Sequence, residues 1–119
     1  SFFHGASNGT MFFQGFLQQT GKVKYYGLNE YPKEDYKLDF DNHWGIYDEP
    51  YLKYFLRCSD TMRKPFFNAV FTLSSHHPYK VPSELEAQFK GGNLPIRLES
   101  MPMAMSKTFI CNTETERSR

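Results

Sequence analysis

Two histidine-bearing stretches have residue types suited to binding an anionic group. The first is a pair of serines followed by His76 and His77, directly after an apolar run over residues 66–73. The second is His4, which follows two phenylalanines. Imidazole and hydroxyl groups can donate hydrogen bonds to the oxygens of an anionic group. Because open α/β sheets bind ligands beyond the carboxyl ends of their strands, residues 74–77 are the candidate rim of a binding cleft. His4 is expected to be displayed by the turn that follows its strand. The alternative for residues 74–77 is a solvated turn.

The apolar run over residues 66–73 predicts a strand that is buried on both faces. Its only polar members are Asn68 and Thr72. A continuous apolar run of this length is typical of a parallel sheet covered by helices. Residues 1–5 have the pattern of the end of a second buried strand, and residues 23–26 that of a short third strand.

Two helices are predicted between these strands. In the first, over residues 11–20, four apolar side chains fall at i,i+3 and i,i+4 spacing, which we interpret as a stripe packed into the core: Phe12, Phe13, Phe16 and Leu17. In the second, over residues 46–62, Asp48 is the expected N-cap, with Tyr51 and Phe55 on the buried face. A further helical turn is expected at residues 83–89, with Ser83 and Glu86 as a capping box.

The alternation of strands and helices predicts an α/β fold, with a partial parallel sheet, right-handed crossovers and flanking helices. Residues 28–41 interrupt it as a long, polar and acidic excursion, of the kind that is usually functional or mobile. Trp44 follows this excursion. Its indole could stack on a sugar or a lipid headgroup, or it could close the loop onto the core.

Composition indicates one small globular domain of 119 residues, with 12 Phe and 8 Tyr to fill a core. A net charge of +1 gives no nucleic-acid signal. Charge is uneven, since residues 29–49 hold seven acids against two lysines. Cys58 and Cys111 match neither a metal motif nor a disulfide framework. The chain has no transmembrane run and no signal-peptide pattern, and it starts without Met, so we expect a piece of something larger.

Several motifs, in this order, resemble the lipoteichoic-acid-synthase-like branch of the sulfatase family. They are Phe2-Phe3-His4-Gly5, Asn8-Gly9-Thr10-Met11, Tyr25-Tyr26-Gly27, Trp44-Gly45-Ile46-Tyr47-Asp48-Glu49-Pro50, Phe71-Thr72-Leu73-Ser74-Ser75-His76-His77-Pro78-Tyr79 and Lys90-Gly91-Gly92-Asn93-Leu94-Pro95-Ile96. The resemblance covers residues 1–97 and implies the central segment of a sulfatase-like domain. Residues 98–119 do not continue it and are expected to form a divergent, poorly ordered tail.

The resemblance implies a segment of the three-layer fold of the alkaline phosphatase superfamily. Members of this branch are membrane-anchored with an extracytoplasmic domain, and they transfer or hydrolyse phosphoglycerol, phosphoethanolamine or sulfate esters. A Thr or Ser nucleophile lies beside a divalent cation (Mn, Mg or Ca) that acts as a Lewis acid. The expected ligand is therefore an anionic phosphate or sulfate ester, with a lipid headgroup or a glycan as its remaining part.

Carried over by motif, His4 and His76 resemble substrate-pocket residues that donate hydrogen bonds to the ester oxygens. His77 is either next to that pocket or solvent-facing. Thr10 lies where some members have Phe-Trp-x-Arg, and this chain has no arginine there. Trp44 completes the expected substrate-binding set.

The resemblance also implies what this chain lacks. In the family, the nucleophile and one metal-binding carboxylate precede the strand of His4, and an Asp-His metal pair follows the Leu-Pro-Ile segment. Neither is present here. We therefore expect no catalytic residue and no metal ligand within the chain, no bound cofactor for the chain alone, and flanking segments of the same domain as its missing partners.

A second hypothesis is a stand-alone binding module that uses its histidines for an anion or a metal. It would need His4, His43, His76 and His77 to converge. Adjacent histidines on an extended segment point to opposite faces, so His76 and His77 cannot readily share one ion. A third possibility is that the segment has no function of its own.

Overall fold

A computed structural model describes residues 1–74, 80–87 and 108–112, the last five as backbone only. Along the chain these residues form the following elements: β1 (Phe2–His4), η1 (Thr10–Phe12), α1 (Phe13–Thr20), β2 (Tyr25–Tyr26), η2 (Leu28–Glu30), α2 (Tyr36–Asp39), α3 (Asp48–Asp60), β3 (Phe66–Phe71), α4 (Ser83–Glu86) and β4 (Thr108–Asn112). No helix among the described residues is both long and apolar enough to cross a membrane.

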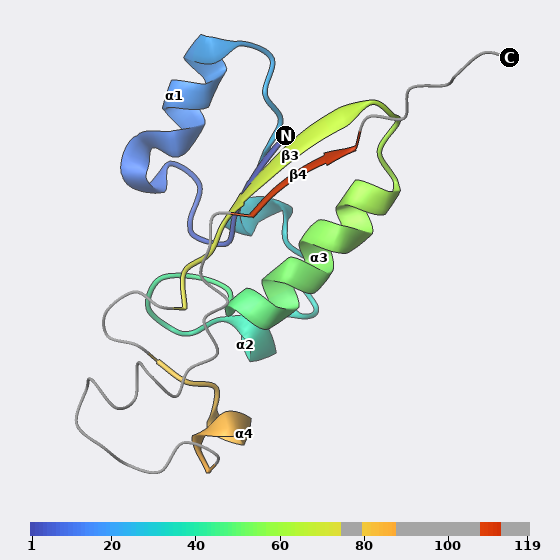
Figure 1. Cartoon of the computed structure of the whole chain (residues 1–119). Helices are drawn as coiled ribbons and strands as arrows, with labels where there is room; N and C mark the ends of the chain where they lie inside the picture. The colour runs from blue at the N-terminus through green and yellow to red at the C-terminus, as the bar shows by residue number, and fades with distance from the viewer. Residues whose placement is uncertain (75–79, 88–107, 113–119) are drawn as a thin grey trace, which may run out of the picture.

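The sheet has the strand order β2-β1-β3-β4. Strand β1 runs parallel to both of its neighbours, so that Phe2 lies opposite Tyr25 on one side and Ala69 on the other. Strand β4 pairs with β3 in the antiparallel direction, and it lies within the segment for which the sequence predicts a divergent tail. The predicted α/β class, with a small parallel sheet and flanking helices, is confirmed (Figure 1).

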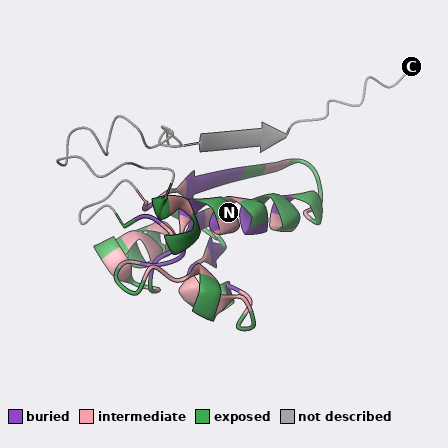
Figure 2. Ribbon diagram, turned by 90° about the horizontal axis from the view of Figure 1, so that it is seen from below, coloured by how far each residue is buried: buried purple, intermediate pink, exposed green. Residues whose placement is uncertain are grey.

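Helices α1 and α3 lie on opposite sides of the sheet (Figure 1). The pleat of β1 explains the two layers, because successive side chains point to opposite faces. Phe3 points toward α3, and its ring centroid lies 4.9 Å from that of Phe55 in this helix. On the same face of the sheet, it lies 4.3 Å from that of Tyr26 in β2. Phe2 points the other way, and its ring lies 5.5 Å from that of Phe13 in α1. Buried residues accordingly lie on β3 and on the adjacent α3 (Figure 2).

The predicted core stripe of the first helix is wrong for two of its members. Phe12 is 85% exposed and Phe16 is 63% exposed, whereas Phe13 packs against the sheet. The reason is local, since Met11 and Phe12 adopt left-handed backbone angles, with φ of 55° and 58°. These two residues end the short η1 turn, and α1 begins only at Phe13, so Phe12 is turned away from the sheet.

Helix α3 starts two residues later than predicted and ends two residues earlier. Its buried face contains Tyr51 and Phe55, as the sequence predicts. The predicted N-cap is wrong, because Tyr47 occupies the cap position and Asp48 is the first helical residue. The side chain of Asp48 instead bonds to backbone beyond β3.

Two shorter predictions are also corrected. Residues 28–41 are not one long loop, because they contain the short helices η2 and α2. Helix α4 is present at the predicted place, but its N-cap is Pro82 and no side-chain cap bond forms, so the capping box is wrong. A proline has no side-chain acceptor for the first amides of a helix.

Candidate functional site

The carboxyl ends of β1 and β3 lie side by side at one edge of the sheet. His4, the last residue of β1, is paired with Phe71, the last residue of β3. Because the two strands are parallel and adjacent, the chain leaves both of them at the same edge, and Ser74 follows only three residues after Phe71. This edge is where open α/β sheets bind ligands. Of the sequence-predicted rim, His76 and His77 lie outside the described residues.

The imidazole of His4 is fully buried on the α1 side of the sheet. Its Nδ1 lies 3.1 Å from the hydroxyl of Tyr25, and its ring lies 5.2 Å and 5.4 Å from the rings of Phe13 and Phe71. Within the described residues, Nε2 has no hydrogen-bond partner. A buried polar atom without a partner is rare in native structures, so Nε2 is available for a ligand. A ligand reaches it only after the surrounding side chains move.

Burial sets the protonation of the His4 pair. Desolvation lowers the pKa of His4 to about 4 and raises the pKa of Tyr25 to about 12. At neutral pH the pair is therefore a neutral imidazole beside an intact phenol. If the phenol donates to Nδ1, the ring proton is on Nε2, which is then a donor for an acceptor oxygen.

Asp48 ties the start of α3 to the chain that leaves β3. Its buried Oδ1 accepts hydrogen bonds from the amide of Leu73 at 2.7 Å and from the amide of Ser74 at 3.1 Å. In return, the amide of Asp48 donates to Oγ of Ser74 at 3.0 Å. We call these three bonds the Asp48 clamp. It fixes the residues from which the predicted histidine rim continues.

The loop before α3 is attached to the end of β1. Oδ1 of Asp41 accepts from three successive amides, those of residues 43–45, at 2.8 to 3.0 Å. Gly45 then lies directly against Gly5, and the amide of Ile46 donates to the Gly5 carbonyl at 2.9 Å. This loop carries the half-buried Trp44, which is thereby held beside the same edge as His4.

Thr10 and His43, the other predicted residues that the structure describes, have ordinary structural surroundings. Thr10 is half-buried at the start of the three-residue η1, and its amide donates to the carbonyl of Ser7. His43 is exposed on its loop, with its ring against that of Trp44. In the described part of the chain, no group of three or more His, Cys, Asp or Glu side chains could hold a metal ion. The described residues therefore do not fit the divalent cation that the resemblance implies.

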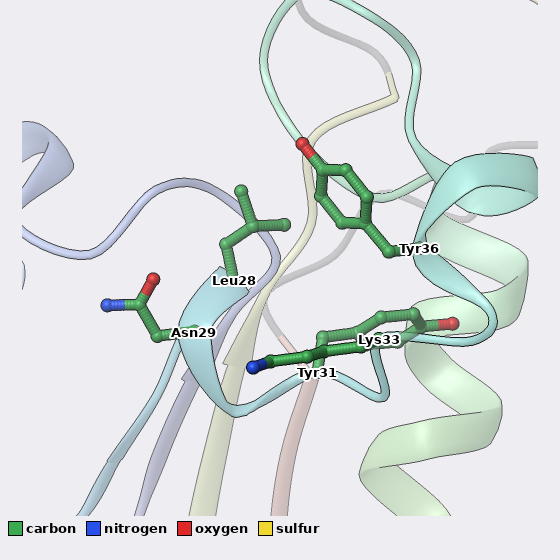
Figure 3. A pocket seen from close by; sticks show the side chains of 5 residues that line it. All are labelled: Leu28, Asn29, Tyr31, Lys33 and Tyr36. Atoms are coloured by element: carbon green, nitrogen blue, oxygen red, sulfur yellow. The ribbon is translucent and has the colours of Figure 1, made fainter.

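A pocket of about 450 Å³ lies between η2 and α2. The sequence marks residues 28–41 as a functional or mobile excursion, but it predicts no pocket and no individual site residue there. The pocket is lined by Leu28, Asn29, Tyr31, Lys33 and Tyr36 (Figure 3). The signal that could have found it is the pair of tyrosines in an otherwise polar excursion. Such a residue choice is unusual for a simple solvated loop.

Comparison of the chain with models of protein families, with curated proteins and with solved structures found no match. The assignment to the sulfatase family therefore remains a proposal from the sequence motifs.

Proposed function

We propose that residues 1–97 are the central, substrate-pocket segment of a sulfatase-like enzyme that transfers or hydrolyses a phosphate or sulfate ester. The observation that carries the proposal is the adjacent, parallel placement of β1 and β3. Both strands therefore end at one edge of the sheet, with His4 and Ser74 there, and this edge is where a shared substrate pocket would lie. The order of the family-like motifs along the chain supports the same conclusion.

In this proposal His4 binds the anionic group through Nε2, which no described residue satisfies. Its low pKa keeps the imidazole neutral at physiological pH, so it contributes a directed hydrogen bond and no full positive charge. Tyr25 orients the ring through Nδ1. The Asp48 clamp holds Leu73 and Ser74. His76 and His77, which lie outside the described residues, are the other proposed contacts with the ester.

The nucleophile, the cation ligands and the membrane anchor belong, in this proposal, to polypeptide outside residues 1–119. A divalent cation bound there would act as the Lewis acid of the reaction. The proposed substrate is an ester of phosphate or sulfate on a lipid headgroup or a glycan. Phosphoglycerol and phosphoethanolamine are the transferred groups that the motifs favour.

The test compares this chain with a longer protein in which family-like flanking sequence is joined to it. Both are assayed against a chromogenic phosphodiester with and without Mn²⁺. We expect no turnover from the 119-residue chain and metal-dependent turnover from the longer protein. In the longer protein, His4→Ala should lower kcat/KM by about 10- to 100-fold, the size expected for a lost hydrogen bond to a charged group.

His43→Ala is the matched control, because this histidine is exposed on a neighbouring loop. Its kcat/KM should stay within about twofold of the parent value, as for most surface substitutions. Metal-dependent turnover by the 119-residue chain alone would contradict the proposed absence of the nucleophile. Equal activity of His4→Ala and His43→Ala in the longer protein would remove His4 from the substrate pocket.

A further inference from the structure

We propose that the pocket between η2 and α2 binds a neutral, hydroxyl-rich sugar ring. We call it the η2–α2 pocket, and its five lining residues are those shown in Figure 3. The inference goes beyond the proposed function and stands without it, because it concerns residues that are not involved in ester chemistry. Its volume, about 450 Å³, is within the range of small-molecule sites.

The location of the pocket favours a role in ligand binding. Leu28 and Asn29 follow β2 almost directly, so the pocket lies at the carboxyl end of that strand. The amide of Leu28 donates to the carbonyl of Ala6 at 3.0 Å, and the amide of Asn29 donates to Oδ1 of Asn8 at 3.1 Å. The η2 turn is thereby attached to the chain that leaves β1 beside His4. The η2–α2 pocket and His4 therefore both lie at the edge of the sheet where the carboxyl ends of β1 and β2 meet.

The pocket offers polar groups that the protein itself does not use. Within the described residues, the amide side chain of Asn29, the ammonium of Lys33 and the hydroxyl of Tyr36 have no hydrogen-bond or ion-pair partner. Together they offer donors and acceptors, as the hydroxyls of a sugar require. In Figure 3 the ring of Tyr36 and the side chain of Leu28 flank the pocket, with Tyr31 and Lys33 below them.

Aromatic rings supply the apolar part of the site. One side of the Tyr36 ring stacks on Phe40, with centroids 4.9 Å apart and planes 20° apart. That contact fixes the ring and leaves its other side for a ligand. Tyr31 contributes little surface, because it is only 4% exposed and its hydroxyl donates to Asp39 at 2.6 Å. The face of Tyr36 is therefore the one that can bind the C–H surface of a sugar, at little cost in side-chain entropy.

Charge decides between neutral and ionic ligands. Residues 28–41 contain five acids and two lysines, and the carboxylate of Asp39 accepts a hydrogen bond from Tyr31, which lines the pocket. A phosphate or sulfate group would be repelled by these carboxylates. A cation would instead meet the ammonium of Lys33, which lines the pocket. A neutral polyol avoids both penalties and can use Lys33 as a hydrogen-bond donor.

The test is a nuclear magnetic resonance titration of the isotope-labelled 119-residue chain with methyl β-D-glucopyranoside. We expect saturable shifts at the side-chain amide of Asn29 and the rings of Tyr31 and Tyr36, with a Kd of about 1 mM, as for a small ligand in a shallow site. Inorganic phosphate and tetramethylammonium serve as the anionic and cationic probes. Neither should give saturable shifts at these residues up to 50-fold the sugar Kd.

Three variants locate the site. Asn29→Ala and Tyr36→Leu should each weaken sugar binding at least fivefold, and Lys33→Met about two- to fivefold. Lys37→Ala is the matched control, because Lys37 is exposed on α2 and does not line the pocket. Its Kd should be unchanged.

Several results would overturn the inference. They are saturable binding of phosphate or tetramethylammonium in the η2–α2 pocket, sugar-induced shifts that map elsewhere, and no saturable sugar shift at all. Loss of sugar binding in Lys37→Ala to the same extent as in Asn29→Ala would do so as well. The titration needs neither metal nor flanking sequence, so its failure is distinct from failure of the proposed enzyme function.

Discussion

Removal of the Asp48 carboxylate is the most direct test of how Leu73 and Ser74 are held beyond the end of β3. In Asp48→Ala, the amides of Leu73 and Ser74 both lose their acceptor. Leu73 is buried, so water cannot fully replace the lost bond at its amide. An unsatisfied buried donor costs about 1–3 kcal/mol. The Ser74 amide is half-buried and its bond is longer, so its share is smaller.

Burial of the carboxylate works in the opposite direction. Desolvation raises the pKa of Asp48 even though two amides and the Ser74 hydroxyl act to lower it. Part of the gain from the bonds therefore offsets the cost of burying a charge. We expect Asp48→Ala to lower the free energy of unfolding by about 1–3 kcal/mol, and Asp48→Asn by about 1 kcal/mol because its amide oxygen can still accept. Out of a typical stability of about 5–15 kcal/mol, the first loss is large.

The assay combines urea unfolding, followed by circular dichroism, with amide hydrogen exchange. In Asp48→Ala, exchange should accelerate most at residues 73 and 74, more than at the Lys53 amide on the solvent side of α3. Ser74→Ala removes the acceptor of the Asp48 amide and the hydroxyl that interacts with the Asp48 carboxylate, and should cost about 0.5–1.5 kcal/mol. Because the two side chains share one clamp, the double variant should cost less than the sum of the single variants.

The clamp would be refuted by either of two results. One is a stability loss in Asp48→Ala below about 0.5 kcal/mol, the range of ordinary surface substitutions. The other is uniform acceleration of exchange across α3 and β3, which would indicate general loosening and no specific bond at Leu73 and Ser74.

Three further predictions concern stability. The pKa of His4 is lowered from 6.5 to about 4, so its contribution to the free energy of unfolding is complete above pH 6.5 and is lost as pH falls toward 4. Between pH 7.5 and 4.5, the wild type should therefore lose about 2–3 kcal/mol more stability than His4→Gln in urea unfolding. Parallel curves of stability against pH for the two proteins would contradict this. Gly45→Ala should lower the free energy of unfolding by at least about 2 kcal/mol, because the added Cβ would collide with the Gly5 carbonyl. Gly15→Ala, which has open space in α1, should raise it by about 0.5–1 kcal/mol. Similar melting temperatures for both variants would be evidence against the close approach of Gly45 to Gly5. Phe12→Asn should raise the free energy of unfolding by about 0.5–1 kcal/mol, because asparagine tolerates the left-handed backbone angle and the exposed phenyl ring makes little packing contact. A lower melting temperature of this variant would show that the ring is needed.

The three parallel strands could be predicted because their signals are local, whereas β4 could not, since residues 108–112 lie in a segment without a clear period. An apolar run such as residues 66–71 indicates a strand in itself, and the alternation of strands with helices then favours parallel pairing. The predicted burial on both faces holds only for residues 68–70, because Phe67 is 54% exposed. The same reasoning placed His4 at the end of a strand. It could not show that the imidazole is enclosed, since that depends on Phe13 and Phe71 closing over it.

The failures involve partners that are distant in sequence or backbone angles that no periodicity encodes. Asp48 has the residue type of an N-cap, but its bonds go to amides 25 and 26 residues away. Met11 and Phe12 are not residues that favour left-handed angles, so the sequence wrongly includes Phe12 at the beginning of the apolar stripe. The η2–α2 pocket depends on how two short helices meet, and neither has a strong period of its own.

The outward-facing side chains of α1 and the turn before it affect how this protein can be studied. Met11, Phe12 and Phe16 are each more than half exposed while the protein is folded. Dyes that fluoresce on apolar surfaces would therefore bind the native state and give a high signal before any heating. In a dye-based melting experiment the transition would be shallow or inverted, so unfolding is better followed by a signal intrinsic to the backbone.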